Sequence, residues 1–362
     1  MADDSNVPGW QPVVSQILLF FLFLGLAAAV DVRDFVAKFT DRAQRKGLIA
    51  GVCCQFGVMP LLGFLVTKAF ALDPVRGTVL LIIASSPGGA FSNWWCALGN
   101  ADLALSIAMT TTSTVLCLFM LPLNAYIYVR GAFGRSVPVD YVTLMVTVGV
   151  VFAGVFSGLA AGTRRPQWRD HLFLLGNVAG LASIILAVAI SNTGDKAAPI
   201  WSRDATFYLS TVAMSTISIA LGVGIPSLLG LGKPQRIAVG IETMYQNLGI
   251  AVAASLSMFN DANDAAKAVG VPIFYGVYAT VVISLLLLGA WKLGWTYAPP
   301  GDPLCQVLSG NYQPVPGTAR GEGVHTAAAV DGDHVALAAA ENGGAVKSDG
   351  QISPTSLQLI ER

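Results

Sequence analysis

Long apolar runs separated by short polar segments dominate the first 296 residues of the chain. A helix that crosses a lipid bilayer needs about 20 mostly apolar residues. Runs of this length predict nine membrane spans, at residues 15–31, 47–67, 76–99, 103–129, 139–162, 171–193, 204–231, 235–259 and 269–296. The connecting segments are too short to hold a soluble domain. The pattern therefore predicts an all-α polytopic membrane protein.

The two ends of the chain are polar. Residues 1–14 start with acidic rather than basic side chains, so we expect the first apolar run to remain as a span and not to be cleaved as a signal peptide. Residues 297–362 are rich in Pro, Gly, Ala and Ser, and we predict a disordered tail because such a segment cannot bury a core. Basic residues are more numerous in the loops on the side of the tail. The positive-inside rule then predicts an extracellular N-terminus and a cytosolic tail.

Composition supports a membrane protein and excludes several other classes. Only 12% of the 362 residues are charged and 54% are hydrophobic, whereas soluble domains carry about 25% charged residues. The net charge of zero provides no basic field for nucleic acid. The five cysteines have no metal-ligand spacing. Paired aspartates, a His-Glu-x-x-His motif or a Ser/His pair at mid-span would suggest an intramembrane enzyme, and the sequence contains none of them.

Glu242 is the only ionisable side chain near the middle of an apolar span. A carboxylate at this depth costs about 2.5–3.5 kcal/mol on insertion scales. Gln246 follows one helical turn later, and we expect it to share a helix face with Glu242; Asn247 is adjacent to it. These oxygen donors suggest a cation site. The alternative is a hydrogen-bonded polar cluster that holds helices together.

Two of the predicted spans are interrupted. Pro87, Gly88 and Gly89 lie within 76–99, where proline removes a backbone donor and glycine permits an unwound backbone. Glu242 and the polar residues after it interrupt 235–259. The two spans cross the membrane in opposite directions, and unwound backbone at membrane depth must be buried or line a wet cavity. Interrupted spans at matching places in inverted halves indicate the binding site of a secondary transporter.

Further oxygen ligands occur on the neighbouring predicted spans. Ser106 and Thr110 are one helical turn apart, and Gln55 is a lone amide near the middle of 47–67. Hydroxyl, amide and carboxylate oxygens suit a hard monovalent cation, whereas transition metals prefer Cys or His ligands. Proton coupling through Glu242 is the less favoured alternative, because a proton requires only the carboxylate.

Four motifs together resemble the bile acid:sodium symporter family. They occur in order at 55–61, 86–93, 105–114 and 242–247, within a similarity that runs over residues 15–296. The layout is most similar to the animal branch of the family, the ileal and liver sodium/bile acid cotransporters.

The resemblance implies an inverted-repeat fold in which two broken helices cross. Residues 15–31 and 139–193 would form a panel domain, and residues 47–129 and 204–296 a core domain. The family also implies two sodium ions as cofactors, at sites that share Glu242. The first site would comprise Ser92, Asn93, Ser106, Thr110 and Glu242. The second would comprise Gln55, Glu242 and Gln246 with the backbone carbonyls of Thr243 and Tyr245.

Residues beside the breaks are the candidates for binding the transported substrate. They are Pro87, Gly88, Gly89, Ala90, Trp94, Trp95, Asn247 and Tyr275. The sequence departs from the family pattern at Ala90-Phe91, where Thr-Ala is usual, and at Trp94-Trp95, where smaller aliphatic residues are usual.

The resemblance implies a sodium-coupled symporter of the plasma membrane. It would import bile acids or related amphipathic organic anions by alternating access, with the anion and membrane lipid as its partners. A proton-coupled organic anion transporter and a non-transporting receptor on the same fold are the alternatives. The sequence does not indicate an oligomeric state.

Overall fold

The computed structural model describes residues 7–29, 42–89, 91–134, 141–191, 200–259, 261–310 and 312–313. Within these ranges the protein is helical, and seven of its helices are long and apolar enough to cross a membrane. Six of the seven correspond to single long α-helices, one of them preceded by a short 3₁₀ turn: α1 (Trp10–Ala28), α7 (Leu103–Phe133), α8 (Tyr141–Arg164), α9 (Arg169–Ser191), α10 (Ala205–Leu228) and α13 (Ala262–Lys292). The seventh joins α3 (Arg42–Cys53), the π-helix η1 (Cys54–Val58) and α4 (Met59–Ala69). The protein is therefore a polytopic integral membrane protein.

The two interrupted spans each occur as a pair of shorter helices. Residues 76–99 contain most of α5 (Pro74–Ser85) and all of α6 (Ser92–Leu98), and residues 235–259 contain most of α11 (Lys233–Met244) and all of α12 (Leu248–Met258). Short 3₁₀ turns, η2 (Pro166–Trp168) and η3 (Ile200–Ser202), precede α9 and α10. The last long helix begins at Ala262, before the predicted start at residue 269.

Aspartate side chains set the starts of three helices. Asp73 accepts hydrogen bonds from the backbone N–H groups of Val75 and Arg76 at the start of α5. Asp261 does the same for Asn263 and Asp264, which explains the early start of α13. Such caps satisfy N–H groups that have no partner within the helix. Asp102 caps α7 in the same way and is considered below.

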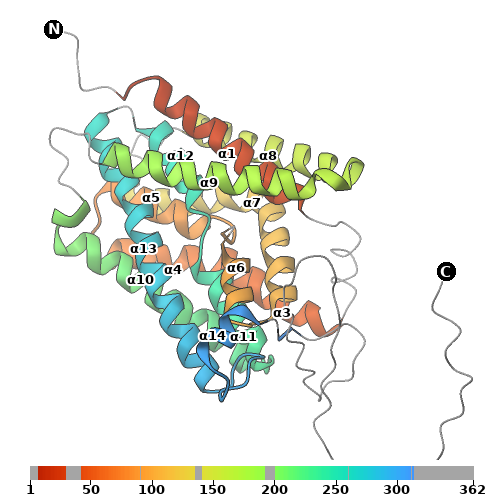
Figure 1. Ribbon diagram of the computed structural model, residues 1–362. Helices are drawn as coiled ribbons and strands as arrows, with labels where there is room; N and C mark the ends of the chain where they lie inside the picture. Colours follow the sequence, from red (N-terminus) through yellow and green to blue (C-terminus); the bar gives the residue numbers. More distant parts are fainter. Residues whose placement is uncertain are drawn as a thin grey trace, which may run out of the picture.

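Helices α1, α8 and α9 lie side by side along one side of the molecule (Figure 1). Small residues allow this close approach: a Cβ atom at Gly158 of α8 would lie 2.2 Å from the carbonyl oxygen of Leu24, and one at Gly25 would lie 2.4 Å from that of Leu172. Gly154 and Gly162 meet the α1 backbone in the same way. Glycines spaced four apart are a common packing device between membrane helices, because they let two backbones touch.

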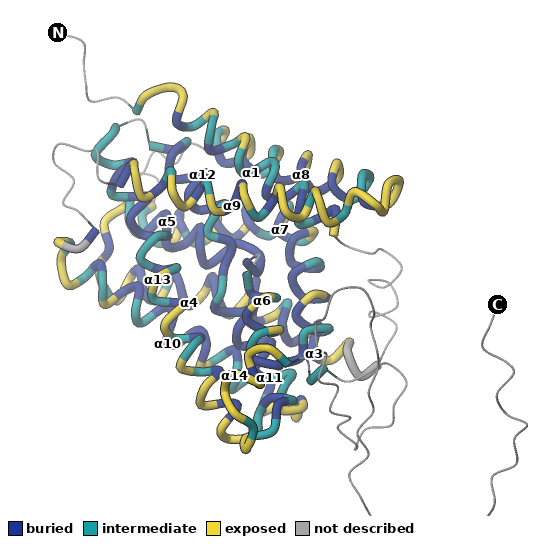
Figure 2. The backbone as a smooth tube through the Cα atoms, viewed as in Figure 1, coloured by how far each residue is buried: buried dark blue, intermediate teal, exposed yellow. Residues whose placement is uncertain are grey.

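The remaining helices surround the interrupted segments. In α5 every residue from Gly77 to Ser85 is buried, and in α11 every residue from Ile237 to Met244 is buried. Figure 2 shows this buried interior, with exposed positions concentrated on the outer helices. The polar residues of the two breaks therefore lie at the centre of the protein.

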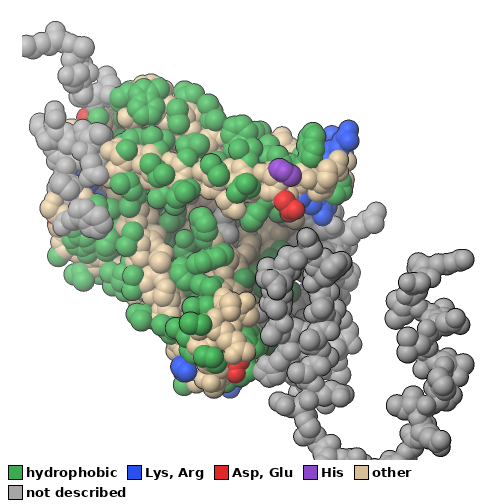
Figure 3. Space-filling view, viewed as in Figure 1, with side chains coloured by type: hydrophobic (Ala, Val, Ile, Leu, Met, Phe, Trp, Pro, Cys, Tyr) green, Lys and Arg blue, Asp and Glu red, His purple; other side chains and the backbone are tan. Residues whose placement is uncertain are grey.

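The outer surface is mostly apolar. Hydrophobic side chains cover most of the face shown in Figure 3, and charged side chains are confined to its ends. Phe119 is 71% exposed and Val142 is 74% exposed. Such a surface suits contact with lipid chains, where exposing apolar side chains has no cost.

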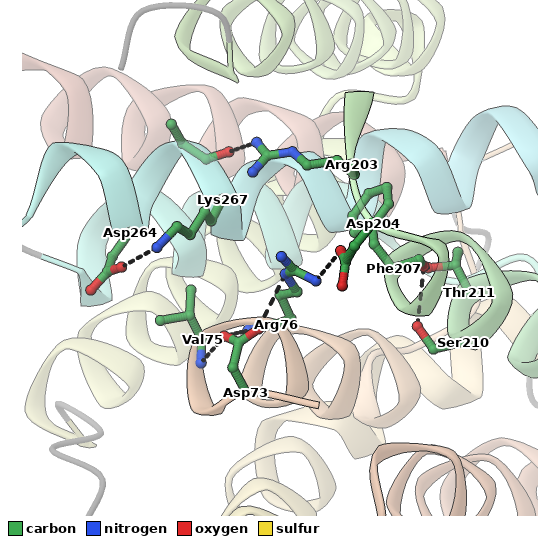
Figure 4. Close-up of polar contacts among 11 residues, drawn as sticks. Asp73, Val75, Arg76, Arg203, Asp204, Phe207, Ser210, Thr211, Asp264 and Lys267 are labelled. Carbon is green, nitrogen blue, oxygen red and sulfur yellow. Dashed lines mark hydrogen bonds and ion pairs between the residues drawn. The ribbon is translucent and has the colours of Figure 1, made fainter. Parts of the chain in front are cut away.

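A group of charged side chains gathers where α5, α10 and α13 begin (Figure 4). Arg76 contacts Asp73 at 3.1 Å and Asp204 at 2.5 Å, and Lys267 contacts Asp264 at 3.4 Å. These partly exposed pairs each contribute about 0–1 kcal/mol. The Arg76–Asp204 pair joins the starts of α5 and α10, whereas each of the other two pairs lies within the start of one helix.

The segment after α13 differs from the sequence prediction. We predicted disorder from residue 297, but residues 297–310 fold back on the bundle and include α14 (Leu304–Ser309). Trp291 is buried and donates its indole N–H to the carbonyl oxygen of Pro299 at 2.7 Å. The prediction was wrong here because Ala298 and Val307 supply an apolar contact for Trp291. Residues 314–362 lie outside the described residues.

We predict that Gly158→Ala destabilises the protein by about 1–3 kcal/mol, because the added methyl group forces α1 and α8 apart. Gly149→Ala, on the same helix, is the control, since a Cβ atom there has nothing within 4 Å. Thermal unfolding of the two purified variants in detergent measures the effect. Equal midpoints for both variants would show that the close approach of α1 and α8 is not a source of stability.

Candidate functional site

The two interrupted segments meet at the centre of the bundle. Gly88 and Gln246 form an isolated antiparallel bridge. The N–H of Gly89 donates to the carbonyl oxygen of Tyr245 at 2.8 Å, and the N–H of Asn247 donates to that of Pro87 at 2.9 Å. Each break thus satisfies backbone groups of the other, as unwound backbone in a membrane protein requires.

Glycine is required where the breaks touch. A Cβ atom at Gly88 would lie 2.0 Å from Oε2 of Glu242, and one at Gly89 would lie 2.7 Å from the carbonyl oxygen of Gln246. The Gly-Gly pair therefore permits both the bridge and the close approach of the backbone to the carboxylate. In the structure these residues lie between the end of α5 at Ser85 and the start of α6 at Ser92.

Glu242 lies inside a cluster of oxygen atoms from three helices. Its Oε1 atom accepts hydrogen bonds from Ser92 on α6 at 2.7 Å, Ser106 on α7 at 2.8 Å and Thr110 at 2.5 Å. The side-chain oxygen of Asn93 lies 2.8 Å from the Ser106 hydroxyl and 3.2 Å from that of Thr110. The structure thus brings together all five residues predicted for the first cation site.

The cluster has more acceptors than hydrogen atoms. Each hydroxyl carries a single hydrogen, yet Thr110 lies within bonding distance of Glu242, Asn93 and its own helix backbone. Oε2 of Glu242 is buried and has no hydrogen-bond partner among the described residues, and the side chain is 1% exposed. A buried carboxylate oxygen without a partner is costly. A bound monovalent cation would supply the missing positive charge, so the residues fit such an ion.

A second polar group lies on the other side of the bridge. Nε2 of Gln55 is 2.6 Å from the carbonyl oxygen of Ser86 and 2.6 Å from Oε1 of Gln246. Gln246 in turn donates to the carbonyl oxygen of Thr243 at 2.5 Å. The structure therefore brings Gln55, Gln246 and the carbonyls of Thr243 and Tyr245 close to the crossing.

One detail of the predicted geometry was wrong. We expected Glu242 and Gln246 on one helix face, but α11 ends at Met244 and Tyr245 is extended, with φ −82° and ψ 91°. Gln246 therefore turns toward Gln55 instead of following Glu242. The helix ends here because its last backbone groups pair with the other break.

The π-helix η1 places Gln55, a feature that the sequence analysis missed. Pro60 has no N–H to offer the carbonyl oxygen of Phe56, four residues earlier, and that oxygen accepts instead from Nδ2 of Asn124 at 3.1 Å. Short π-helices are common at functional sites. The sequence feature that could have indicated the irregular helix is Pro60, which lies inside an apolar span.

Ser113 is a second residue that the sequence analysis did not single out. Its hydroxyl oxygen accepts from the backbone N–H of Gly88 at 3.2 Å. It thereby supports the unwound segment from α7. The sequence feature that could have identified Ser113 is its place among the hydroxyl residues that follow Ser106 and Thr110.

Only some of the residues predicted for substrate binding line a cavity. A small cavity of about 40 Å³ lies between α1, α9 and the crossing, and its walls are Leu22, Gly89, Phe91, Gly180, Ile184, Tyr245, Gln246, Asn247, Leu248 and Gly249. Asn247 and Gly89 thus line it. A larger, open depression of about 620 Å³ between α1, α8 and α12 is lined by none of the predicted residues.

The other predicted substrate residues do not line either cavity. Trp95 is 8% exposed and packs edge-on against Trp94, which is 54% exposed. Tyr275 is buried and donates to the carbonyl oxygen of Met244 at 2.5 Å, so it supports the end of α11. Pro87 and Gly88 belong to the bridge, and Ala90 lies outside the described residues.

Comparison with known proteins finds one family model and several similar membrane transporters. The model of the Sodium Bile acid symporter family matches residues 16–197. The sodium-dependent organic anion transporter of Rattus norvegicus is 29% identical over 83% of this chain and 81% of its own length. The ileal sodium/bile acid cotransporter of Cricetulus griseus is 26% identical over 80% of this chain and 83% of its own length. The hepatic sodium/bile acid cotransporter of Homo sapiens is 28% identical over 65% of this chain and 67% of its own length.

The family model matches half of the chain, and the similarity to the relatives extends over most of the remainder. The resemblance inferred from the four motifs is confirmed. The chain belongs to the sodium bile acid symporter family, which consists of membrane transporters and not of enzymes.

Proposed function

We propose that the protein is a sodium-coupled symporter of the plasma membrane that imports an amphipathic organic anion. Bile acids and related steroid-like anions are the favoured substrate class, since the relatives are named for bile acids and organic anions. The observation that carries the proposal is the buried Glu242, whose carboxylate meets three hydroxyl groups and has an oxygen atom without a partner.

Two sodium ions would bind on either side of the bridge. The first would be held by the cluster around Glu242, and the second by Gln55, Gln246 and the carbonyls of Thr243 and Tyr245. Glu242 would be shared, because its second oxygen is close to the Gly88 backbone and thus to the bridge. Shared use of one carboxylate would make binding of one ion favour binding of the other, since each ion orders ligands that the other uses.

The substrate would bind next to the crossing. Asn247 lines the cavity there and caps α12, with its side-chain oxygen 3.4 Å from the N–H of Ile250. The N-terminus of α12 carries the positive end of the helix dipole, which favours an anionic group. Leu22 and Ile184 on the facing helices would contact the apolar body of the anion.

Transport would proceed by alternating access. Helices α1, α8 and α9 would form a panel domain and the other long helices a core domain, as two inverted repeats, with the two moving relative to one another around the crossing. The cavity between α1, α9 and the crossing supports this division, because it lies at the boundary of the two groups. The N-terminus would be extracellular and the tail cytosolic.

Charge balance would couple transport to the membrane potential. Entry of two sodium ions with one monoanion moves a net positive charge inward. Each such charge gains about 2.3 kcal/mol per 100 mV of membrane potential. A proton-coupled mechanism is less favoured, because a proton requires only the carboxylate, whereas Glu242 lies among further oxygen atoms from Asn93 and three hydroxyl groups.

Glu242→Gln is expected to abolish sodium-driven uptake, because the amide keeps the size of the side chain and removes the charge that binds sodium. Uptake into vesicles with sodium, potassium or a pH gradient as the only driving force measures the effect. Asp264→Asn, which makes the same change at an exposed ion pair, is the control and should transport normally. A Glu242→Gln variant with normal sodium-dependent uptake would refute sodium binding at this residue.

Ser106→Ala and Gln55→Ala are expected to raise the sodium concentration for half-maximal uptake by about tenfold to a hundredfold each, since an interaction with a charged group is worth about 1.5–3 kcal/mol. The variant with both changes should be close to inactive, because each change weakens a different ion site. Ser284→Ala, at an exposed hydroxyl bonded to its own helix, is the control. Unchanged sodium dependence in both single variants would contradict the two-site assignment.

Trp94→Ala is expected to change which anions compete for uptake, with bulky steroid-like anions gaining over small ones, while sodium dependence stays the same. The reason is the exposed indole ring beside Ser92-Asn93, which occupies volume near the breaks. Competition assays with anions of increasing size measure this change. Trp168→Ala, at another exposed tryptophan between α8 and α9, is the control, and identical competition profiles for the two variants would exclude Trp94 from substrate selection.

A further inference from the structure

The chain reverses direction after α13 and returns to the bundle. Gly294 has φ +64°, and the N–H of Trp295 donates to the carbonyl oxygen of Ala290 at 2.8 Å, which closes the end of the helix. The residues that follow, 297–310 and 312–313, are called the clasp below. Within the clasp, α14 contacts α6.

The clasp is held by a small apolar cluster of its own. Trp291 of α13 packs with Ala298 and Val307, and Tyr312 packs against them. Tyr312 donates its phenol hydrogen to Asp302 at 2.7 Å. Burial raises the pKa of Tyr312 to about 12, and Asp302 adds to the shift, so the phenol keeps this hydrogen at physiological pH.

The clasp contacts the corner between α6 and α7, residues 99–102, through Asn100. Asn100 is fully buried and has φ +53°. Its side chain donates to the carbonyl oxygen of Val307 at 2.8 Å and accepts from the N–H of Tyr312 at 3.1 Å. Its own carbonyl oxygen accepts from the N–H of Tyr297 at 2.9 Å. Both ends of the clasp therefore bind one corner residue.

Gln313 joins the clasp to the first turn of α7. Its Nε2 atom donates to the carbonyl oxygen of Ala101 at 2.7 Å, and its Oε1 atom accepts from the N–H of Leu103 at 3.2 Å. Leu103 is the first residue of α7, so its N–H has no partner within the helix. One amide from the clasp thus caps the helix that carries Ser106 and Thr110.

Asp102 links the same corner to α11. Its carboxylate caps α7 by accepting from the N–H of Leu105 at 2.9 Å, and it accepts a longer bond of 3.4 Å from the hydroxyl of Tyr297. Its N–H donates to the carbonyl oxygen of Pro234 at the start of α11. The corner therefore connects α6, α7 and α11, the three helices that bring the oxygen atoms around Glu242.

We propose that the clasp positions the ligands of the first sodium site through the corner between α6 and α7, with Asn100 and Gln313 as positioning residues. Ser106 lies one turn beyond the capped start of α7, and Asn93 lies near the start of the short α6, whose other end meets the corner. A shift of the corner therefore moves ligands on two helices together. The inference rests on the proposed function, because it concerns the affinity of the sodium site.

The test uses Asn100→Gly and Gln313→Ala, singly and together, in the full chain. Glycine tolerates the positive φ at position 100, so the first change removes the side-chain hydrogen bonds and keeps the backbone conformation. Gln306→Ala makes the same substitution as Gln313→Ala at an exposed position of α14 and is the matched control. Sodium dependence of uptake, the anion KM at saturating sodium and sodium-dependent thermal stabilisation of the purified protein are measured for each.

The variants are expected to raise the sodium concentration for half-maximal uptake about fivefold singly and more together, because two side-chain hydrogen bonds are lost in each case. The sodium concentration that gives half of the thermal stabilisation should rise equally. The anion KM at saturating sodium should stay unchanged, as should every value for Gln306→Ala. A clasp with only a structural role would lower the unfolding temperature without changing the sodium dependence.

Unchanged sodium dependence in the Asn100→Gly/Gln313→Ala variant would overturn the proposal, provided that the unaltered protein responds to sodium. A rise in the anion KM at saturating sodium, equal to the change in sodium affinity, would also overturn it, because the clasp would then act on the whole crossing. An unaltered protein that shows neither sodium-driven uptake nor sodium-dependent stabilisation would refute the proposed function itself, and the clasp proposal with it.

Discussion

The crossing of the two interrupted segments depends on mutual satisfaction of backbone hydrogen bonds. A break in a membrane-embedded helix leaves N–H and carbonyl groups without partners, and each unsatisfied group costs several kcal/mol in a low-dielectric interior. Here Gly89 pairs with Tyr245 and Asn247 pairs with Pro87. Neither break is stable alone, so the position of α5–α6 determines that of α11–α12. The oxygen atoms around Glu242 and Gln55 are brought close as a consequence.

The candidate site combines oxygen atoms of the crossing with oxygen atoms from the helices around it. Glu242 and Gln246 belong to the crossing itself, while Ser106 and Thr110 come from α7 and Gln55 from the π-helix η1. A cation that binds all of these atoms stabilises one arrangement of several helices. Such an arrangement allows ion binding to favour one conformation over another, which is the requirement for coupling two transported species.

Close packing at glycine residues holds α1 against α8 and α9. Backbone atoms of α1 approach α9 closely at Gly25 and approach α8 closely at Gly158. The clasp acts at the other side of the bundle, where it joins α13 to the corner between α6 and α7 through Asn100. One group of helices is thus held by small residues and the other by hydrogen bonds around the breaks.

The amino-acid sequence by itself determined which segments are apolar enough to enter the membrane, where proline, glycine and polar residues interrupt two of them and which residues carry the candidate ion ligands. Apolar runs, Pro87-Gly88-Gly89 and a carboxylate at bilayer depth are local features, because each reflects the cost of placing those groups in lipid. The tertiary structure decided that Gln246 faces Gln55 instead of following Glu242, because α11 ends where its backbone pairs with the other break. It also decided that residues 297–310 fold onto the bundle, since Asn100, which is remote in the sequence, donates a hydrogen bond to the carbonyl oxygen of Val307. Contacts of this kind join residues up to 212 positions apart, and local composition carries no signal for them.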